Sequence, residues 1–206
     1  MKKIKVGVVE DESMAAQMLT TWLDRTGVFK AVGYAGTDEQ GWRLCTTRCP
    51  DVVLLDVGLA SGDGLRLAQR LKTRAPQIKP IIVSGREDPY LLYRVHQLAL
   101  PGYVSKSSAL ATLQEAILTV AEGRTYYTEP FGRHLQSQDA FFRILSKREV
   151  EVLFATTQAH PNGTACKKLQ VTKGTLLKHL ANIRRKLGLH TTAELVRYAM
   201  HLGMDL

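Results

Sequence analysis

With 206 residues, the chain is long enough to hold two modest domains that each bury a core of their own. Hydrophobic residues make up 45% of the chain and charged residues 23%, as in most globular proteins, and no apolar run reaches the roughly 18 residues that a membrane span needs. Met1-Lys2-Lys3 leads into a predicted strand without a signal peptide, so we expect a cytoplasmic protein with no membrane partner.

Positive charge is concentrated in the C-terminal part of the chain. Residues 1–122 contain 15 Lys and Arg against 13 Asp and Glu, a net charge of +2, whereas residues 123–206 contain 13 against 6, a net charge of +7. A basic excess of this kind is typical of a domain with a polyanionic partner, although a solvated basic surface would give the same count.

Apolar runs and helical patterns alternate over the first 122 residues. Strands are predicted near 4–9, 30–35, 52–56, 80–84 and 102–105, and helices near 13–26, 38–48, 64–74, 88–98 and 108–122. Five strand–helix repeats predict an α/β fold with a five-stranded parallel sheet and helices on both faces. Ser13 is predicted to cap the first helix, and Thr37 or Asp38 the second.

Polar side chains follow the apolar runs where the strands end. The run Val52–Leu55 ends at Asp56, the first strand ends at Glu10-Asp11-Glu12, and Ser84 and Lys106 end the fourth and fifth. Right-handed crossovers bring these ends to one edge of the sheet, where open α/β sheets bind ligands. Carboxylates there suit Mg²⁺, and hydroxyl and ammonium groups suit a phosphoryl group. The alternative is an aspartate that only starts a turn.

Residues 3–122 resemble the receiver domain of two-component response regulators, which has a flavodoxin-like, doubly wound fold. The matching residues stand in the family's order: Glu10-Asp11, Asp56, Ser84, Tyr103 and Lys106. The resemblance implies that Asp56 accepts a phosphoryl group from a sensor histidine kinase, with Mg²⁺ held by Glu10, Asp11, Asp56 and the Gly58 carbonyl. It also implies that Lys106 and Ser84 bond the phosphoryl oxygens. Tyr103 would turn its ring inward on activation, and a simply packed aromatic ring is the alternative.

Two loops depart from the family's pattern. Val57-Gly58-Leu59-Ala60 stands where the family usually ends in Met-Pro, and Ser107 follows Lys106 where many members have proline. Neither change removes a reacting group, so we expect altered loop shapes and retained chemistry. Gly58 leaves one side of the phosphoryl group open, whereas Arg86 could cover it.

The strand–helix rhythm ends after residue 122. Proline, glycine and polar residues mark a linker over 123–142, with a short helix possible at 131–136. From 143 to 206 the pattern is all-helical. Its first and last helices begin with capping boxes, in which a hydroxyl and a glutamate each accept a backbone N–H of the other residue: Ser146 with Glu149, and Thr191 with Glu194.

The first of these helices is predicted to end near Gln158, and a short helix at 163–170 and a longer one at about 173–187 follow. Thr172 is predicted as the N-cap of the longer helix, which has one apolar stripe: Leu176, Leu180, Ile183 and Leu187. A short helix, a tight turn and a basic second helix predict a helix-turn-helix, whose second helix enters the major groove of DNA.

Residues 143–206 resemble the four-helix DNA-binding domain of the NarL/FixJ (LuxR-type) regulators. The matching residues are Leu145-Ser146-Lys147-Arg148-Glu149, Thr175 with His179, Ile183, and Lys186-Leu187. DNA contacts are therefore expected from Lys173, Thr175, Lys178, His179, Asn182, Arg184, Arg185 and Lys186. Helical geometry turns Gly174, Lys178, Ala181 and Arg185 away from the apolar stripe.

The helix-turn-helix also departs from its family. Gly163-Thr164-Ala165-Cys166 replaces a lysine-glutamate-isoleucine-alanine run, and Leu177 stands where the family often has lysine. Leu177 could touch thymine methyl groups or pack on a protein partner. Phosphate binding by the basic residues is supported, but the base preference cannot be read from the sequence.

The leading hypothesis is a phosphorylation-controlled transcription regulator that binds promoter half-sites of DNA as a homodimer. Its only reactions would be the phosphorylation and dephosphorylation of Asp56. The alternative is a receiver whose degenerate helix-turn-helix acts through protein contacts rather than specific DNA binding. An aspartyl-phosphate phosphatase is disfavoured because such enzymes need a second Asp two residues after the nucleophile, where this chain has Gly58.

Overall fold

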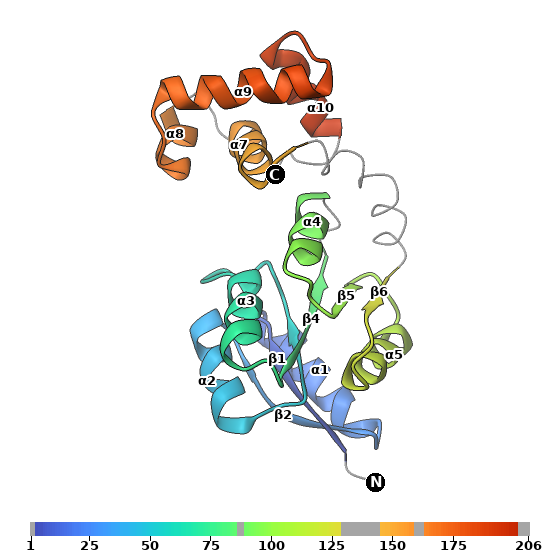
Figure 1. Cartoon of the computed structure of the whole chain (residues 1–206). Helices are drawn as coiled ribbons and strands as arrows, with labels where there is room; N and C mark the ends of the chain where they lie inside the picture. Colours follow the sequence, from blue (N-terminus) through green and yellow to red (C-terminus); the bar gives the residue numbers. More distant parts are fainter. Residues whose placement is uncertain (1–2, 86–88, 129–144, 159–162, 202–206) are drawn as a thin grey trace. The chain divides into compact units, whose positions relative to one another are not determined.

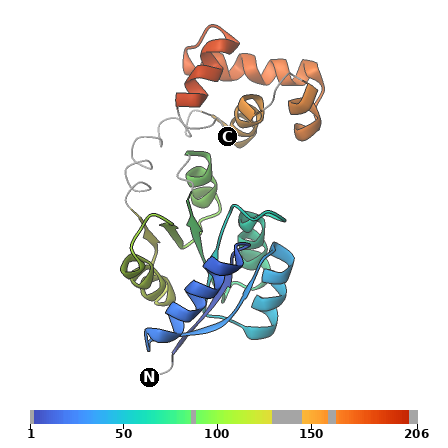
Figure 2. The same ribbon diagram turned by 180° about the vertical axis from the view of Figure 1, so that it is seen from behind.

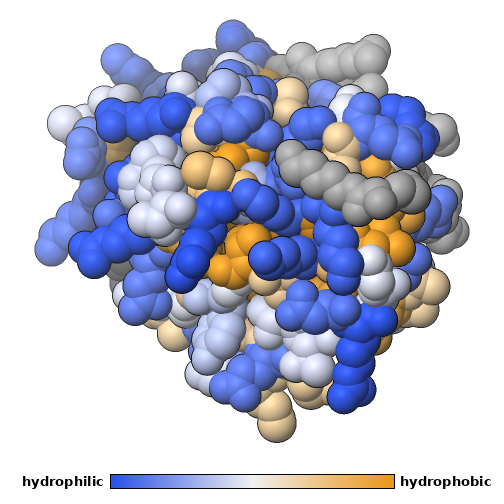
Figure 3. All heavy atoms as spheres, turned by 90° about the horizontal axis from the view of Figure 1, so that it is seen from below, coloured by the Kyte–Doolittle hydropathy of each residue, from blue (hydrophilic) through white to orange (hydrophobic). Residues whose placement is uncertain are grey.

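The computed structural model describes residues 3–85, 89–128, 145–158 and 163–201 (Figure 1). The chain divides into two compact units, one built mainly from residues up to 131 and the other mainly from the residues after it. None of the described helices is long and apolar enough to cross a membrane. Polar and charged side chains cover most of the face seen in Figure 3. The predictions for Arg86 and for a helix at 131–136 fall outside the described residues.

The first unit contains a parallel sheet with the strand order β2-β1-β3-β4-β5-β6. The strands are β1 (Ile4–Val9), β2 (Phe29–Ala35), β3 (Val52–Leu55), β4 (Lys79–Ser84), β5 (Gly102–Ser105) and β6 (Tyr126–Tyr127). The predicted doubly wound parallel sheet is confirmed, and its five predicted strands are all present. Because every neighbouring pair is parallel, the carboxyl ends of β1, β3, β4 and β5 lie along one edge.

The sheet has six strands rather than the five predicted, and the sixth falls in the segment that was predicted to be a linker. β6 pairs in parallel with β5 and so extends the sheet past residue 122. Two residues are too few to show the alternation that identifies a strand in a sequence. Hydroxyl groups help to fix this segment: Tyr127 donates to the Leu100 carbonyl at 2.7 Å, and Thr128 Oγ1 accepts the Ser105 N–H at 3.2 Å.

Helices cover both faces of the sheet: α1 (Ser13–Arg25), α2 (Asp38–Arg48), α3 (Gly64–Arg74), α4 (Pro89–Gln97) and α5 (Leu110–Ala121). On one face, Leu23 of α1 and Ile117 of α5 share a buried cluster with Val8, and Figure 2 shows α1 in front of the sheet. On the other face, a Cβ on Gly41 of α2 would lie 2.8 Å from Val9. Successive residues of β1 thus pack against helices on opposite faces of the sheet.

The helix caps follow the sequence in part. Thr37 caps α2 as predicted, since its Oγ1 accepts the Gln40 N–H at 3.2 Å, and Asp38 lies inside the first turn. The prediction for Ser13 is wrong, because Ser13 is already the first residue of α1 and the N-cap is Glu12, which makes no side-chain cap bond. The prediction therefore placed the N-cap one residue too late and expected a hydroxyl cap that α1 does not have.

The second unit is helical, with α7 (Lys147–Gln158), α8 (Gly163–Leu169), α9 (Lys173–Leu187) and α10 (Thr192–His201). The predicted stripe of α9 lies in the core, with Leu176, Leu180 and Ile183 buried and Leu187 partly buried. Thr172 caps α9 as predicted, since its Oγ1 accepts the Thr175 N–H at 3.2 Å.

Both capping boxes are confirmed. Ser146 N–H donates to Glu149 Oε2 at 2.7 Å, and Glu149 N–H donates back to Ser146 Oγ at 3.3 Å. In the second box, Glu194 N–H donates to Thr191 Oγ1 at 3.1 Å, and Thr191 N–H to Glu194 Oε2 at 3.3 Å. These local bonds fix where α7 and α10 begin.

Candidate functional site

Three carboxylates meet at the carboxyl edge of the sheet. Glu10 and Asp11 follow β1, and Asp56 follows the neighbouring strand β3. One carboxylate oxygen from each residue lies within 4.8 Å of those from the other two. Glu10 is 4% exposed and Asp56 is 8% exposed, so little water screens the repulsion between their charges.

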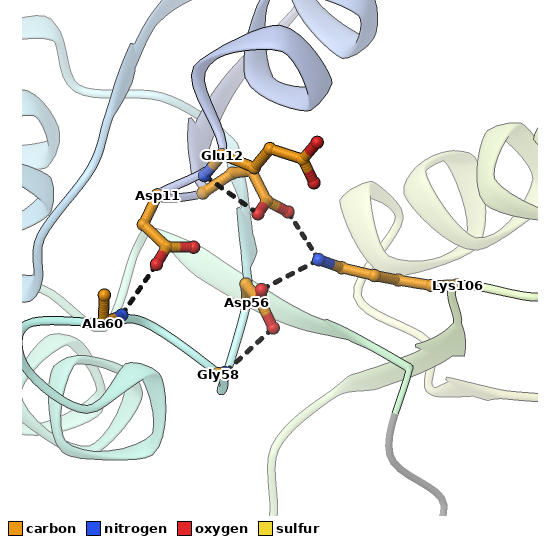
Figure 4. Close-up of polar contacts among 7 residues, drawn as sticks. Asp11, Glu12, Asp56, Gly58, Ala60 and Lys106 are labelled. Carbon is orange, nitrogen blue, oxygen red and sulfur yellow. Dashed lines mark hydrogen bonds and ion pairs between the residues drawn. The ribbon is translucent and has the colours of Figure 1, made fainter.

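The ammonium group of Lys106 links two of these carboxylates. Lys106 follows β5, and its Nζ donates to Glu10 Oε2 at 2.7 Å and to Asp56 Oδ2 at 2.8 Å (Figure 4). Partial burial lowers the pKa of Lys106, but the hydrogen bonds and charges of Asp56 and Glu10 outweigh burial and raise this pKa above its ordinary value. Lys106 therefore stays protonated and offsets part of the negative charge.

The loop after β3 supplies backbone donors to the same carboxylates. Gly58 N–H donates to Asp56 Oδ1 at 2.9 Å, and Ala60 N–H donates to Asp11 Oδ2 at 2.7 Å (Figure 4). The departure of this loop from the family's sequence thus leaves it in contact with the site. These bonds hold the two carboxyl groups in place without any side chain of the loop.

Gly64 is a residue of the site that the sequence reading missed. A Cβ at Gly64 would lie 2.0 Å from the Asp56 carbonyl oxygen, a distance that no real Cβ can adopt. The chain therefore returns from the loop onto the backbone of Asp56, and only glycine fits. The available signal was a glycine at the start of α3, directly after the N-cap Asp63.

The two predicted hydroxyl residues lie in buried positions on neighbouring strands. Ser84 ends β4 and is 1% exposed, and its carbonyl oxygen accepts the Lys106 backbone N–H at 2.8 Å. Tyr103 of β5 is 0% exposed, so its ring is packed inside the unit. Ser84 is thus tied to the backbone of Lys106, whereas Tyr103 lies in the core.

The donor set suits a hard divalent cation. The atoms that meet are carboxylate oxygens, which Mg²⁺ prefers over nitrogen or sulfur. Three carboxylates against one ammonium leave an excess of negative charge that a cation would balance. The residues present therefore fit the predicted Mg²⁺.

The exposed side of α9 is basic. Most of the predicted DNA-contacting side chains are exposed: Lys173, Thr175, Lys178, Asn182, Arg185 and Lys186. His179 and Arg184 are partly buried, and Arg184 Nη1 donates to the His190 carbonyl at 3.3 Å. The row of cations that the sequence predicted is thus present on one helix, with Arg184 held toward its C-terminal end.

Lys186 differs from the other predicted contacts, because its Nζ donates to Glu149 Oε2 at 2.7 Å. Burial raises the pKa of Glu149, but the bonds from Lys186 and Ser146 outweigh burial and lower this pKa below its ordinary value. Lys186 therefore ties α9 to the first turn of α7. The sequence did not indicate this ion pair.

Two family models match the chain. Residues 6–118 match the response regulator receiver domain, and residues 143–199 match the bacterial regulatory proteins of the luxR family. The first match alone spans more than half of the chain.

Similar proteins match over nearly their whole length. The response regulator GacA of Pseudomonas aeruginosa is 28% identical to this chain, and the match covers 98% of this chain and 97% of GacA. The oxygen regulatory protein NreC of Staphylococcus aureus is 28% identical, and the match covers 96% of this chain and 97% of NreC. RcsB of Salmonella enterica serovar Typhimurium, solved on a promoter with the phosphomimetic BeF3⁻, gives a TM-score of 0.69 at 22% identity, over 96% of this chain and 98% of that one.

Proposed function

The chain belongs to the two-component response regulators that join a receiver domain to a luxR-type domain, and we propose that phosphorylation of Asp56 controls its binding to DNA. It is a transcription regulator rather than an enzyme with a separate substrate. One observation carries the proposal: the Asp56 carboxylate lies between acidic neighbours and the Lys106 ammonium at the ligand-binding edge of the sheet.

In the proposed reaction, an oxygen of the Asp56 carboxylate attacks the phosphorus atom of a phosphohistidine on the sensor kinase. An oxygen–phosphorus bond forms, the phosphorus–nitrogen bond breaks, and its electron pair leaves with the histidine nitrogen. Lys106 Nζ lies 2.8 Å from Asp56 Oδ2, so it is close enough to bond the phosphoryl oxygens and to balance their negative charge. Ser84, on the adjacent strand, would bond one of these oxygens. Hydrolysis of the resulting acyl phosphate returns Asp56 to its carboxylate.

Glu10, Asp11 and Asp56 are the residues proposed to hold Mg²⁺, with the Gly58 carbonyl as a further ligand. When bound, this ion supplies positive charge that lets an anionic phosphoryl group approach an anionic carboxylate. Glu10 and Asp11 orient the site, and the N–H groups of Gly58 and Ala60 keep the carboxyl groups from turning away.

For the DNA-binding unit, we propose that α9 enters the major groove, with Lys173, Lys178 and Arg185 near phosphates. One small helix-turn-helix has limited affinity, so two copies of the phosphorylated chain would bind paired half-sites. RcsB, of the same fold, has been solved on DNA. Because Lys186 is engaged with Glu149, we assign it to holding α9 in place rather than to DNA.

The proposal is tested by incubating the full chain with acetyl phosphate and Mg²⁺ and following its mass. The wild-type chain should gain one phosphoryl group, and Asp56→Asn should gain none. Glu12→Gln is the matched control, since this exposed carboxyl group stands beside Glu10 and Asp11 but outside the proposed ligands. Labelling of Asp56→Asn would overturn the assignment of the acceptor.

A further inference from the structure

An exposed leucine lies on the basic side of α9. Leu177 is 53% exposed, and within the described part of the second unit it is the large hydrophobic side chain that is open to solvent. Leucine at such a position contributes nothing to the core, which the neighbouring stripe Leu176, Leu180 and Ile183 already fills. The side chain is therefore available to a partner of the helix.

Two of the positions next to Leu177 on the surface of α9 are occupied by small residues. Gly174 lies one turn before it and Ala181 one turn after it, and both are exposed. A Cβ on Gly174 would meet only Thr172 Oγ1, at 3.9 Å, so the space beside the leucine is open. Leu177 consequently projects beyond these two residues, and a partner surface can approach the backbone of α9 closely on this side.

The charges around Leu177 select the chemistry of that partner. α9 has five Lys and Arg residues and no Asp or Glu in its sequence KGTLLKHLANIRRKL. Lys173 lies one turn before the leucine and Lys178 follows it in the sequence, and both are exposed, as is Arg185 farther along the helix. A surface that is strongly basic around one apolar projection fits a polyanion that offers an apolar group in a groove. In DNA, that group is the 5-methyl of thymine, at the edge of the major groove.

We propose that Leu177 reads thymine, by packing against the 5-methyl group of a thymine in each half-site. This inference rests on the proposed function, because it requires α9 to lie in the major groove. Lys178 and Arg185 would supply affinity through phosphates without regard to sequence, and Leu177 would supply discrimination at one base step. Gly174 and Ala181 permit the approach because larger side chains there would hold the helix away from the bases.

The test uses double-stranded DNA selected from a randomised pool by the full-length chain after treatment with acetyl phosphate. Each thymine of the selected site is then replaced by uracil, which removes the methyl group and leaves the hydrogen-bonding pattern of the base unchanged. For one thymine per half-site, the replacement should weaken binding by the wild-type chain about fourfold, the effect of losing one buried methyl group. Leu177→Ala should bind the thymine and uracil sites equally.

Leu110→Ala is the matched control, because Leu110 is 49% exposed but lies on α5 of the first unit. This variant should keep the thymine–uracil difference of the wild-type chain. Leu177→Ala should fold normally, since it removes an exposed side chain from a helix and alanine is the better helix former. Circular dichroism checks that point.

The outcomes separate this inference from the proposed function. If the phosphorylated chain selects no DNA, the proposed function itself fails. If DNA is selected but no thymine shows a methyl effect that depends on Leu177, the inference is overturned and DNA binding stands. Unchanged affinity and base preference in Leu177→Ala would likewise overturn the inference.

Discussion

The two sites of this chain are built in opposite ways. The carboxylate site joins residues far apart in sequence, since Lys106 is 50 residues from Asp56 and 96 from Glu10 yet bonds both within 2.8 Å. The basic face of α9 comes from one helix of 15 residues, capped by its neighbour Thr172 and ended by Gly188. The first site exists only when the whole sheet is formed, whereas the second needs one helix and the core beneath it.

This difference predicts how each site responds to substitution. In the carboxylate site, Asp56 accepts bonds at both oxygens and Asp11 at one, so moving the backbone by a fraction of an ångström disturbs several bonds together. On α9, the proposed DNA contacts come from separate side chains, so losses of DNA affinity should be graded and nearly additive. Substitutions that leave the reacting groups intact test this contrast best.

Gly64→Ala should have the largest effect, although it changes no side chain of the carboxylate site. The new Cβ would lie 2.0 Å from the Asp56 carbonyl oxygen and must displace the loop or the strand end. We expect the first unit to lose more than about 3 kcal/mol of unfolding free energy, together with labelling by acetyl phosphate. Urea unfolding followed by Trp22 and Trp42 fluorescence, both in the first unit, measures the loss.

Gly85→Ala is the control for this prediction. A Cβ at Gly85 meets nothing within 4 Å, although the residue stands at the same edge of the sheet. Its effect should stay within about 0.5 kcal/mol. Wild-type stability and labelling in Gly64→Ala would show that the loop relaxes, and that the carboxylate site is less rigid than its contacts indicate.

Lys178→Ala with Arg185→Ala should weaken DNA binding without unfolding the second unit, because both side chains are exposed. If each contacts one phosphate, the slope of log K against log salt should become shallower by about 1.8, since each phosphate contact contributes about 0.9. Lys30→Ala with Arg74→Ala removes the same charge from exposed positions of the first unit and should leave the slope nearly unchanged. A salt slope equal to that of the wild-type chain would remove α9 from the DNA interface.

The carboxylate site was readable from the sequence because its residues stand at strand ends. Once the apolar runs over 4–9, 52–56 and 102–105 are identified, the rules of parallel sheets bring Glu10, Asp56 and Lys106 together without further knowledge. The same local reasoning found the capping boxes, because a box needs only two residues at a spacing of three. Fold and site were thus predictable wherever a local pattern or a topological rule sufficed.

What the sequence could not supply depends on close approach in space. Gly64 is a required glycine because it lies against the Asp56 carbonyl, and the pairing of Lys186 with Glu149 depends on how α9 packs on α7. β6 is too short to leave a periodic pattern, and its position depends on hydrogen bonds made by Tyr127 and Thr128. Each of these features is set by three-dimensional distances rather than by spacing along the chain.

Glu149→Ala tests an ion pair through which α9 depends on a distant residue. Glu149 accepts bonds from Ser146 and Lys186, and its loss should cost the second unit about 2 kcal/mol at neutral pH. Because the pKa of Glu149 lies below its ordinary value of 4.5, this contribution is present above about pH 4.5 and is lost as the pH falls through the lowered pKa. The difference in unfolding free energy between wild type and variant should therefore disappear in acid. Amide NMR signals of α7 and α9, followed during urea unfolding, would measure it.

Glu151→Ala is the control on the same helix. Glu151 pairs with Arg148 at 2.9 Å on the surface, where such pairs contribute little, so its loss should cost less than about 0.5 kcal/mol at any pH. A stability difference for Glu149→Ala that persists below the pKa of Glu149 would mean that packing, not the charge, stabilises this end of α7.

Lys186→Met should change the salt slope of DNA binding little if Lys186 pairs with Glu149 rather than with phosphates.

Thr128→Val should have the smallest effect. It tests whether the carboxylate site depends on the segment around β6, at the edge of the sheet. Valine keeps the shape of threonine but leaves the buried Ser105 N–H without the Thr128 Oγ1 acceptor, which should cost the first unit about 1 kcal/mol. Since Ser105 precedes Lys106, we expect slower labelling by acetyl phosphate at unchanged DNA affinity of the unphosphorylated chain. Thr125→Val, exposed in the same segment, should change neither quantity. Equal labelling rates for both variants would confine the site to the first five strands and make β6 only a covering edge.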